Sequence, residues 1–190
     1  MARIISAYDR ALKKINEQLV KMCNRVDHQL TQAMTALMQQ DVEAAKEVIR
    51  GDDEIDLLDE ELEMEALEVF SLQQPEDQDL RFLTAIMRIG HELERISDYA
   101  CDIAEIVLML QDKGPYFKPL VDVPLMGDLV KKMMHKSVSG YLQGDLKSAR
   151  ELDDDDWQLD ELFISLQVEL TDFMKKGPEY VDQASNLLLV

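Results

Sequence analysis

Apolar residues recur every three or four positions through the first part of the chain. They stand at Tyr8, Leu12, Ile15, Leu19, Met22, Val26, Leu30, Ala33 and Leu37. On a helix this spacing places all of them on one side and predicts a single amphipathic helix of about nine turns. The opposite side carries charged and polar residues, so we expect the stripe to face a core.

Two further long helices follow by the same pattern. The second runs from about Asp41 to about Leu72 with Gly51 inside it, and the third runs from beyond Pro75 to about Gln111. Proline cannot continue a helix, so Pro75 marks the break between them. Helices of about 30 residues are about 45 Å long. Joined by short connections, they are expected to pack as an antiparallel bundle.

The second half of the chain repeats the first at a constant offset of 104 residues. The offset pairs Gln39 with Gln143, Asp41 with Asp145, Ala45 with Ala149, Glu47 with Glu151, Asp52 with Asp156, Asp56 with Asp160, Leu62 with Leu166 and Glu65 with Glu169. An ungapped repeat of this length indicates a duplicated three-helix unit. We expect a first repeat over residues 1–111, a linker over 112–124 that holds three of the five prolines, and a second repeat over 125–190.

The same offset predicts an all-α fold of two pseudo-symmetric antiparallel three-helix bundles, the second of them incomplete. It pairs Leu83 with Leu187 and Ile86 with Val190, so the sixth helix would stop after one or two turns. A protein of this pattern is expected to continue for about 30 residues. The apolar stripes of the fourth and fifth helices would then lack cover, and we expect a homo-oligomer, most simply a dimer.

The chain is strongly acidic. Twenty Lys and Arg residues against 39 Asp and Glu residues give a net charge of −19. A surface of this charge repels nucleic acid and anionic lipid, so proteins and metal ions are the expected partners. Cys23 and Cys101 are isolated, as in reduced cytosolic proteins. No signal peptide and no apolar run of about 18 residues is visible, so we expect a cytoplasmic protein without membrane insertion.

Carboxylates gather on one face of several predicted helices, four residues apart. Stacked like charges at this spacing cost a few tenths of a kcal/mol per pair unless a cation neutralises them. Carboxylate oxygens suit hard cations such as iron, Mn²⁺, Mg²⁺ or Ca²⁺. The candidate metal ligands are Asp52, Asp56, Glu94, Asp98, Asp102, Asp156 and Asp160. Taken alone, a solvated acidic face is the simpler interpretation of the same pattern.

No arrangement of residues points to catalysis, and we name no catalytic or cofactor-binding residue. The chain holds no phosphate-binding loop and no Ser/His/Asp order. The alternative is a carboxylate-bridged di-iron enzyme or an iron-storage bundle, which needs Glu-x-x-His on two helices. Here the nearest match, from His91 to Glu94, is reversed and occurs once. His28 and His135 stand isolated, Trp157 is expected in the core, and the run 153–156 is expected to be solvated.

Three motifs in order resemble the PhoU family of phosphate-specific transport system accessory proteins. They are GDDEIDLLDEEL at 51–62, QQPEDQDLRF at 73–82 and LERISDYACDIAE at 93–105. The resemblance implies paired three-helix bundles that bind iron or other metals through Asp52, Asp56, Glu94, Asp98, Asp156 and Asp160. Asp102 replaces a common Asn. A second LERIxD motif is missing, so one of the two acidic sites would be incomplete.

The same resemblance implies what the protein does. Members of the family are cytoplasmic negative regulators of phosphate uptake and of phosphate-starvation signalling. They are expected to contact the ATPase subunit of the phosphate ABC transporter and the phosphate sensor histidine kinase. We therefore expect a regulatory protein rather than an enzyme.

Overall fold

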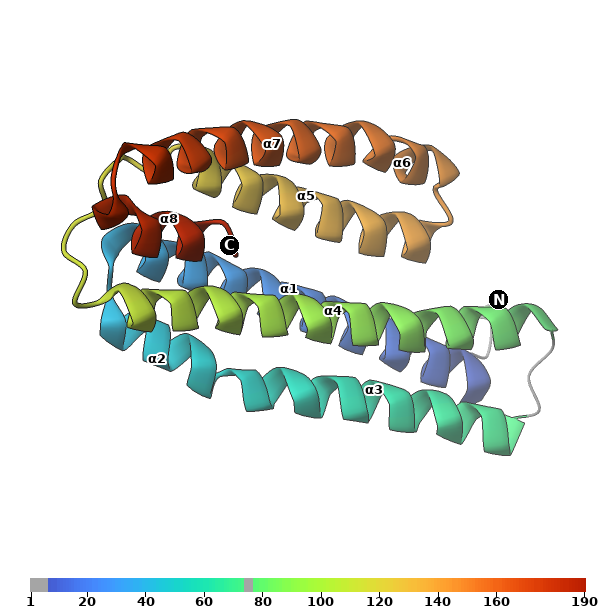
Figure 1. The fold of residues 1–190 in the computed structure, drawn as a ribbon. Coiled ribbons are helices and arrows are strands. Elements are labelled where there is room, and N and C mark those ends of the chain that lie inside the picture. Colours follow the sequence, from blue (N-terminus) through green and yellow to red (C-terminus); the bar gives the residue numbers. More distant parts are fainter. Residues whose placement is uncertain (1–6, 74–76) are drawn as a thin grey trace.

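The computed structural model describes residues 7–73 and 77–190, and all regular structure within them is helical (Figure 1). The expected all-α fold is thereby confirmed. The first unit comprises α1 (Ala7–Gln39), α2 (Val42–Arg50), α3 (Asp52–Gln73) and α4 (Asp77–Leu110). The second unit comprises α5 (Asp122–Gln143), α6 (Leu146–Arg150), α7 (Leu152–Lys176), the 3₁₀ turn η1 (Pro178–Tyr180) and α8 (Val181–Leu187). Pro75, the predicted break, lies outside the described residues.

The apolar stripe predicted on the first helix lies at the centre of the first unit. Ile15, Leu19, Met22 and Val26 are completely buried, and α1 packs against both α3 and α4. Full burial of such side chains is worth about 1.5–3 kcal/mol each. The periodicity therefore placed the core correctly along α1.

The predicted second helix is in fact two helices, α2 and α3, separated at Gly51. Asp41 caps α2, because its side chain accepts hydrogen bonds from the backbone N–H groups of Glu43 and Ala44, both at 3.0 Å. Near the other end of α2, the Gln29 side chain of α1 donates to the carbonyl of Val48 at 3.2 Å. A side chain that enters the helical hydrogen-bond ladder beside a glycine is a recognised cause of a kink.

The segment that connects the two units ends three residues earlier than predicted. Residues 111–121 hold no helix, but α5 already begins at Asp122, so the last three residues of the predicted linker 112–124 are helical. Pro124 lies in the first turn of α5. A proline is tolerated in that turn because the first N–H groups of a helix have no partner within it.

The two units pack against each other. Helix α5 packs on α1, and the ring of Tyr141 stacks on Phe82 at 5.6 Å between centroids. The Tyr141 hydroxyl also donates to the carbonyl of Phe82 at 2.8 Å. Tyr141 therefore has cover from the first unit, although the apolar stripe of the fourth predicted helix was expected to lack cover.

Helix α8 occupies the place of the predicted sixth helix. It packs on α7 and α4 and is secured by Gln183, which is 6% exposed. The Gln183 amide donates to the carbonyls of Lys113 and Pro115 at 3.1 and 3.2 Å and accepts from the N–H of Phe117 at 3.2 Å. One side chain thus satisfies three backbone groups of the connecting segment.

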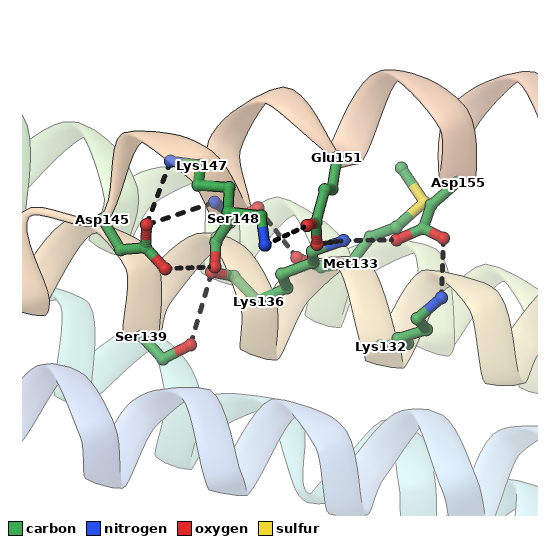
Figure 2. A network of polar contacts seen from close by, with 10 residues as sticks. Lys132, Met133, Lys136, Ser139, Asp145, Lys147, Ser148, Glu151 and Asp155 are labelled. Atoms are coloured by element: carbon green, nitrogen blue, oxygen red, sulfur yellow. Dashed lines mark hydrogen bonds and ion pairs between the residues drawn. The ribbon is translucent and has the colours of Figure 1, made fainter.

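The acidic run at the start of α7 is not uniformly solvated, which corrects the expectation for 153–156. Asp155 is buried and forms ion pairs with Lys132 at 2.6 Å and Lys136 at 3.1 Å (Figure 2). Its hydrogen bonds to Lys132 and then Lys136 lower the pKa of Asp155. Four consecutive residues of a helix point to all of its sides, so one residue of the run necessarily faces α5.

Trp157 is also placed differently from expectation, since 63% of it is exposed. Leu166 and Leu170 take the buried face of α7, and Trp157 lies on the opposite side of the helix. Several methionines, among them Met64 at 64% and Met109 at 59%, are exposed as well. A large apolar side chain was therefore not a reliable sign of the core.

Candidate metal site between two acidic helices

Asp52 is the most firmly held of the candidate ligands. Ser97 Oγ of α4 donates to its Oδ1 at 2.6 Å, and Gln29 Nε2 of α1 lies 3.3 Å from the same atom. Ser97 and Gln29 are themselves buried, and Ser97 Oγ also lies next to Gln29 Oε1. Asp52 begins α3, where the helix dipole also favours a negative charge. Three helices thus fix the position of one carboxylate.

Asp56 of α3 lies near Glu94 and Asp98 of α4, where the two helices pack together. Desolvation raises the pKa of Asp56, and the nearby charges of Asp52 and Asp98 raise it further. Desolvation likewise raises the pKa of Glu94, followed by repulsion from Asp98, while His91 opposes the rise. Both shifts arise mainly from desolvation, and repulsion from neighbouring carboxylates adds to it. We call Asp52, Asp56, Glu94 and Asp98 the acidic cluster.

His91 stands beside the cluster and is mostly solvated. Its Nδ1 lies 3.5 Å from Glu94 Oε2 and 3.8 Å from Asp59 Oδ2. The helices approach closely here because residue 90 is glycine. A Cβ at Gly90 would lie 2.7 Å from Asp59 Oδ1 and 2.7 Å from Leu62 Cδ2. The missing side chain lets α3 and α4 bring their carboxylates together.

The remaining candidates lie apart from the cluster. Asp102 is exposed on α4, one turn beyond Asp98. Asp156 and Asp160 are exposed on α7, which packs on α5, α6, η1 and α8 rather than on α3. The seven predicted ligands therefore fall into three groups: the acidic cluster, Asp102 next to it, and the separate pair Asp156 and Asp160 on α7.

Three residues of this region were not anticipated from the sequence, namely Gln29, Gly90 and Ser97. Gln29 and Ser97 are polar residues that lie among the apolar positions of α1 and α4. A polar residue in such a stripe must be hydrogen-bonded when it is buried, and this was the available signal. Nothing in the sequence showed that their common partner is Asp52.

The chemistry of the cluster fits a hard cation, because its donor atoms are carboxylate oxygens with uncompensated negative charge. Within residues 7–73 and 77–190, however, no three His, Cys, Asp or Glu side chains already converge on one point in a geometry suited to a metal. Rotation of the exposed carboxylates would be needed to bring them onto a common ion. Asp52, held by Ser97 and Gln29, is the fixed member of the set.

A cysteine, a histidine and an aspartate also form a polar contact between the two units. Cys23 Sγ of α1 lies 3.6 Å from His135 Nδ1 of α5, and His135 Nε2 lies 3.2 Å from Asp27 Oδ1. His135 is therefore not isolated. The order Cys–His–Asp is that of a thiol nucleophile, but Cys23 is 2% exposed and burial raises its pKa to about 11. A buried, protonated thiol is a poor nucleophile, so the contact connects α1 and α5.

The fold and the acidic cluster together define a helical-bundle protein built by duplication, with carboxylate-rich helix faces. A family model described as PhoU domain matches residues 19–107 and 123–190. The phosphate-specific transport system accessory protein PhoU homolog of Aquifex aeolicus is 36% identical over 181 residues, which are 95% of this chain and 81% of that protein. PhoU homolog 1 of Methanothermobacter thermautotrophicus is 30% identical over 96% of this chain and 84% of its own length. The chain belongs to the PhoU family.

Solved structures agree with this assignment. PhoU from Pseudomonas aeruginosa superimposes with a TM-score of 0.90 at 25% identity, over 96% of this chain and 87% of that one. The phosphate transport system regulatory protein PhoU from Streptococcus pneumoniae shares the fold, with a TM-score of 0.87 at 24% identity over 96% and 85% of the two chains. None of the described helices has the length and apolar character needed to cross a membrane.

Proposed function

We propose that this protein is a cytoplasmic negative regulator of phosphate uptake and of phosphate-starvation signalling. The observation that carries the proposal is the 36% identity, over 95% of this chain, to an accessory protein of a phosphate-specific transport system. Its role would be regulatory rather than catalytic. The thiol of Cys23 lies next to His135 but is buried, which supports that view.

The proposed mode of action is contact with other proteins. The partners would be the ATPase subunit of the phosphate ABC transporter and the phosphate sensor histidine kinase. A net charge of −19 supports protein contact over binding to DNA, whose phosphates such a surface repels. The charge would attract basic patches on the partners and raise association rates at low salt.

This mode of action is tested by retention of each partner on the immobilised protein. The ATPase subunit and the cytoplasmic part of the kinase from the same organism should be retained at micromolar concentration, and an unrelated ABC ATPase should not. A gel-shift titration at physiological salt should give no specific DNA complex. Retention of neither partner would contradict the proposed mode of action, while the fold would stand.

We further propose that the acidic cluster binds iron or another hard cation such as Mn²⁺, Mg²⁺ or Ca²⁺, with Asp102 as a neighbouring ligand. Asp156 and Asp160 would be the counterpart of the cluster in the second unit. Two observations support the cluster as a site: the raised pKa values of Asp56 and Glu94, and the hydrogen bonds by which the buried Ser97 and Gln29 hold Asp52.

Metal analysis of protein purified without chelators or an affinity metal tests the site. The double variant Glu94→Gln/Asp98→Asn should lose most of the bound metal and keep its helicity. The matched control is Glu43→Gln/Glu47→Gln on α2, where the same spacing occurs but Lys46 and Arg50 already pair with the carboxylates. Equal metal content in the two double variants would reject the cluster as the ligand set.

A further inference from the structure

The outer side of α7 carries an apolar row that no other described element covers. Trp157, Ile164 and Val168 are 63%, 58% and 58% exposed. On a helix they fall within about 40° of one another and extend for about 16 Å. They point away from Leu166 and Leu170, the residues by which α7 enters the core. We call these three side chains the α7 row. Figure 1 shows α7 at the outer edge of the molecule, with α5 between it and the first unit.

Acidic residues line both sides of this row. They are Asp153, Asp154, Asp160, Glu161 and Asp172, all of them exposed. Among the described residues, no Lys, Arg or His forms an ion pair with the first four, and Asp172 pairs with Lys175 at 2.8 Å. An exposed row of large apolar side chains bordered by carboxylates, most of them without an ion-pair partner in the described residues, is complementary to an apolar row bordered by basic residues.

The internal repeat allows the same helix face to be compared in the first unit, where a third long helix is present. The offset of 104 residues places Trp157, Ile164 and Val168 at the positions of Asp53, Glu60 and Met64 on α3. All three remain exposed in the first unit, although α4 is in place there. A third long helix would therefore leave the α7 row uncovered. At two of these positions the second unit has Trp157 and Ile164, whereas the first unit has Asp53 and Glu60.

We propose that the α7 row and its flanking carboxylates bind an amphipathic helix of a partner protein, one whose apolar face is bordered by Lys or Arg. The apolar row supplies the binding energy, and the carboxylates set the orientation and reject acidic partners. The proposal rests on the proposed function only in taking the protein to act through protein partners.

Trp157 is the one tryptophan of the chain, so its fluorescence reports on this surface directly. The probe is a synthetic helical peptide of about 18 residues with a leucine face bordered by lysines. The charge-reversed control carries glutamates in place of the lysines. Binding of the lysine peptide should shift the emission of Trp157 to the blue, as the indole leaves water. Affinity should fall as salt rises, and the glutamate peptide should not bind.

Matched variants identify the surface. Ile164→Ser should weaken binding of the lysine peptide by about tenfold or more. Met64→Ser should leave binding unchanged, because Met64 occupies the repeat position of Val168 and is similarly exposed on another acidic helix. Circular dichroism should show that both variants keep the wild-type helix content, since both positions are exposed.

Several results would overturn the proposal. They are no emission shift, equal binding of the two peptides, or equal losses in the two variants. A shift caused by phosphatidylcholine vesicles but not by the peptide would assign the row to a membrane surface instead. A shift that depends on protein concentration alone would assign it to a second copy. None of these results bears on retention of the transporter ATPase or the kinase, which tests the proposed function separately.

Discussion

At the scale of residues, two buried polar side chains hold the second unit in place. Gln183 satisfies backbone groups of the connecting segment, and Asp155 forms ion pairs with two lysines of α5. Removal of a buried polar side chain leaves its hydrogen-bonding partners unsatisfied, which costs about 1–3 kcal/mol. Single substitutions at these two positions should therefore have measurable effects.

Gln183→Leu should lower the free energy of unfolding by about 1–3 kcal/mol. The leucine keeps the volume of the side chain but leaves the carbonyls of Lys113 and Pro115 and the N–H of Phe117 without their partner. Urea unfolding followed by circular dichroism measures the change. Gln167→Leu, at an exposed position on α7, is the control and should change stability little. Equal effects of the two substitutions would contradict the structural role of Gln183.

The ion pairs of Asp155 predict a pH dependence. Lys132 and Lys136 lower the pKa of Asp155 in the folded protein, so between that pKa and the ordinary value near 4 the unfolded chain binds more protons. The stability from the pairs is thus present at neutral pH and is lost as pH falls through the folded pKa. Unfolding of Asp155→Asn and wild type should differ most at pH 7 and converge in acid. A constant difference would contradict this assignment.

At the scale of elements, α3 and α4 are held together by their apolar faces against the repulsion of their acidic faces. Ile55, Leu62, Leu83 and Ile86 are almost completely buried between the helices of this unit. Carboxylates close to one another oppose this packing by a few tenths of a kcal/mol for each like-charged pair. The helices therefore carry a local electrostatic cost that a bound cation would remove.

Glu94→Gln/Asp98→Asn should consequently stabilise the metal-free protein at pH 7, by up to about 1 kcal/mol. The pKa of Glu94 is raised in the folded protein. At pH values between the ordinary pKa of glutamate and this raised pKa, the folded state therefore binds more protons than the unfolded state. The stability of wild type then falls as pH rises through the folded pKa. The advantage of the variant should shrink as pH falls. Thermal unfolding in chelator at several pH values tests this, and destabilisation at pH 7 would contradict it.

At the scale of the whole molecule, an apolar groove runs between the two units. It is lined on α4 by Leu93 and Ile96, on α5 by Val130 and Met134, and on α7 by Leu159. Leu159 projects from α7 almost opposite to Trp157, so the groove is separate from the α7 row. Contiguous apolar surface of this kind is seldom left in water.

We expect the 190-residue chain to associate with itself through this groove. Sedimentation equilibrium should show a mass that rises with protein concentration, and Leu159→Glu should shift it toward the monomer, because the new charge lies in the groove. Emission from Trp157 should not change with this association. A monomer at all concentrations, without binding of an apolar dye, would show that the groove is closed in solution.

Part of the candidate site could be predicted from the sequence, and part could not. The i, i+4 spacing identified Asp52, Asp56, Glu94 and Asp98 as side chains on helix faces, because helical periodicity is a local property. It gave equal weight to Asp156 and Asp160, which lie apart on α7. The contribution of Ser97, Gln29 and Gly90 depends on which helices meet, and no local pattern contains that information.

The sequence by itself determined the long amphipathic helices and their acidic faces, since both follow from the spacing of residues along one helix. The constant offset of 104 residues indicated the duplication. Tertiary structure decided that Gln29 of α1 lies beside the carbonyl of Val48, close to the break at Gly51. It also decided that Asp155 is buried and Trp157 exposed, two residues apart on α7. Periodicity places residues on the faces of a helix, but the neighbouring helices decide which face is covered and what each buried polar group contacts.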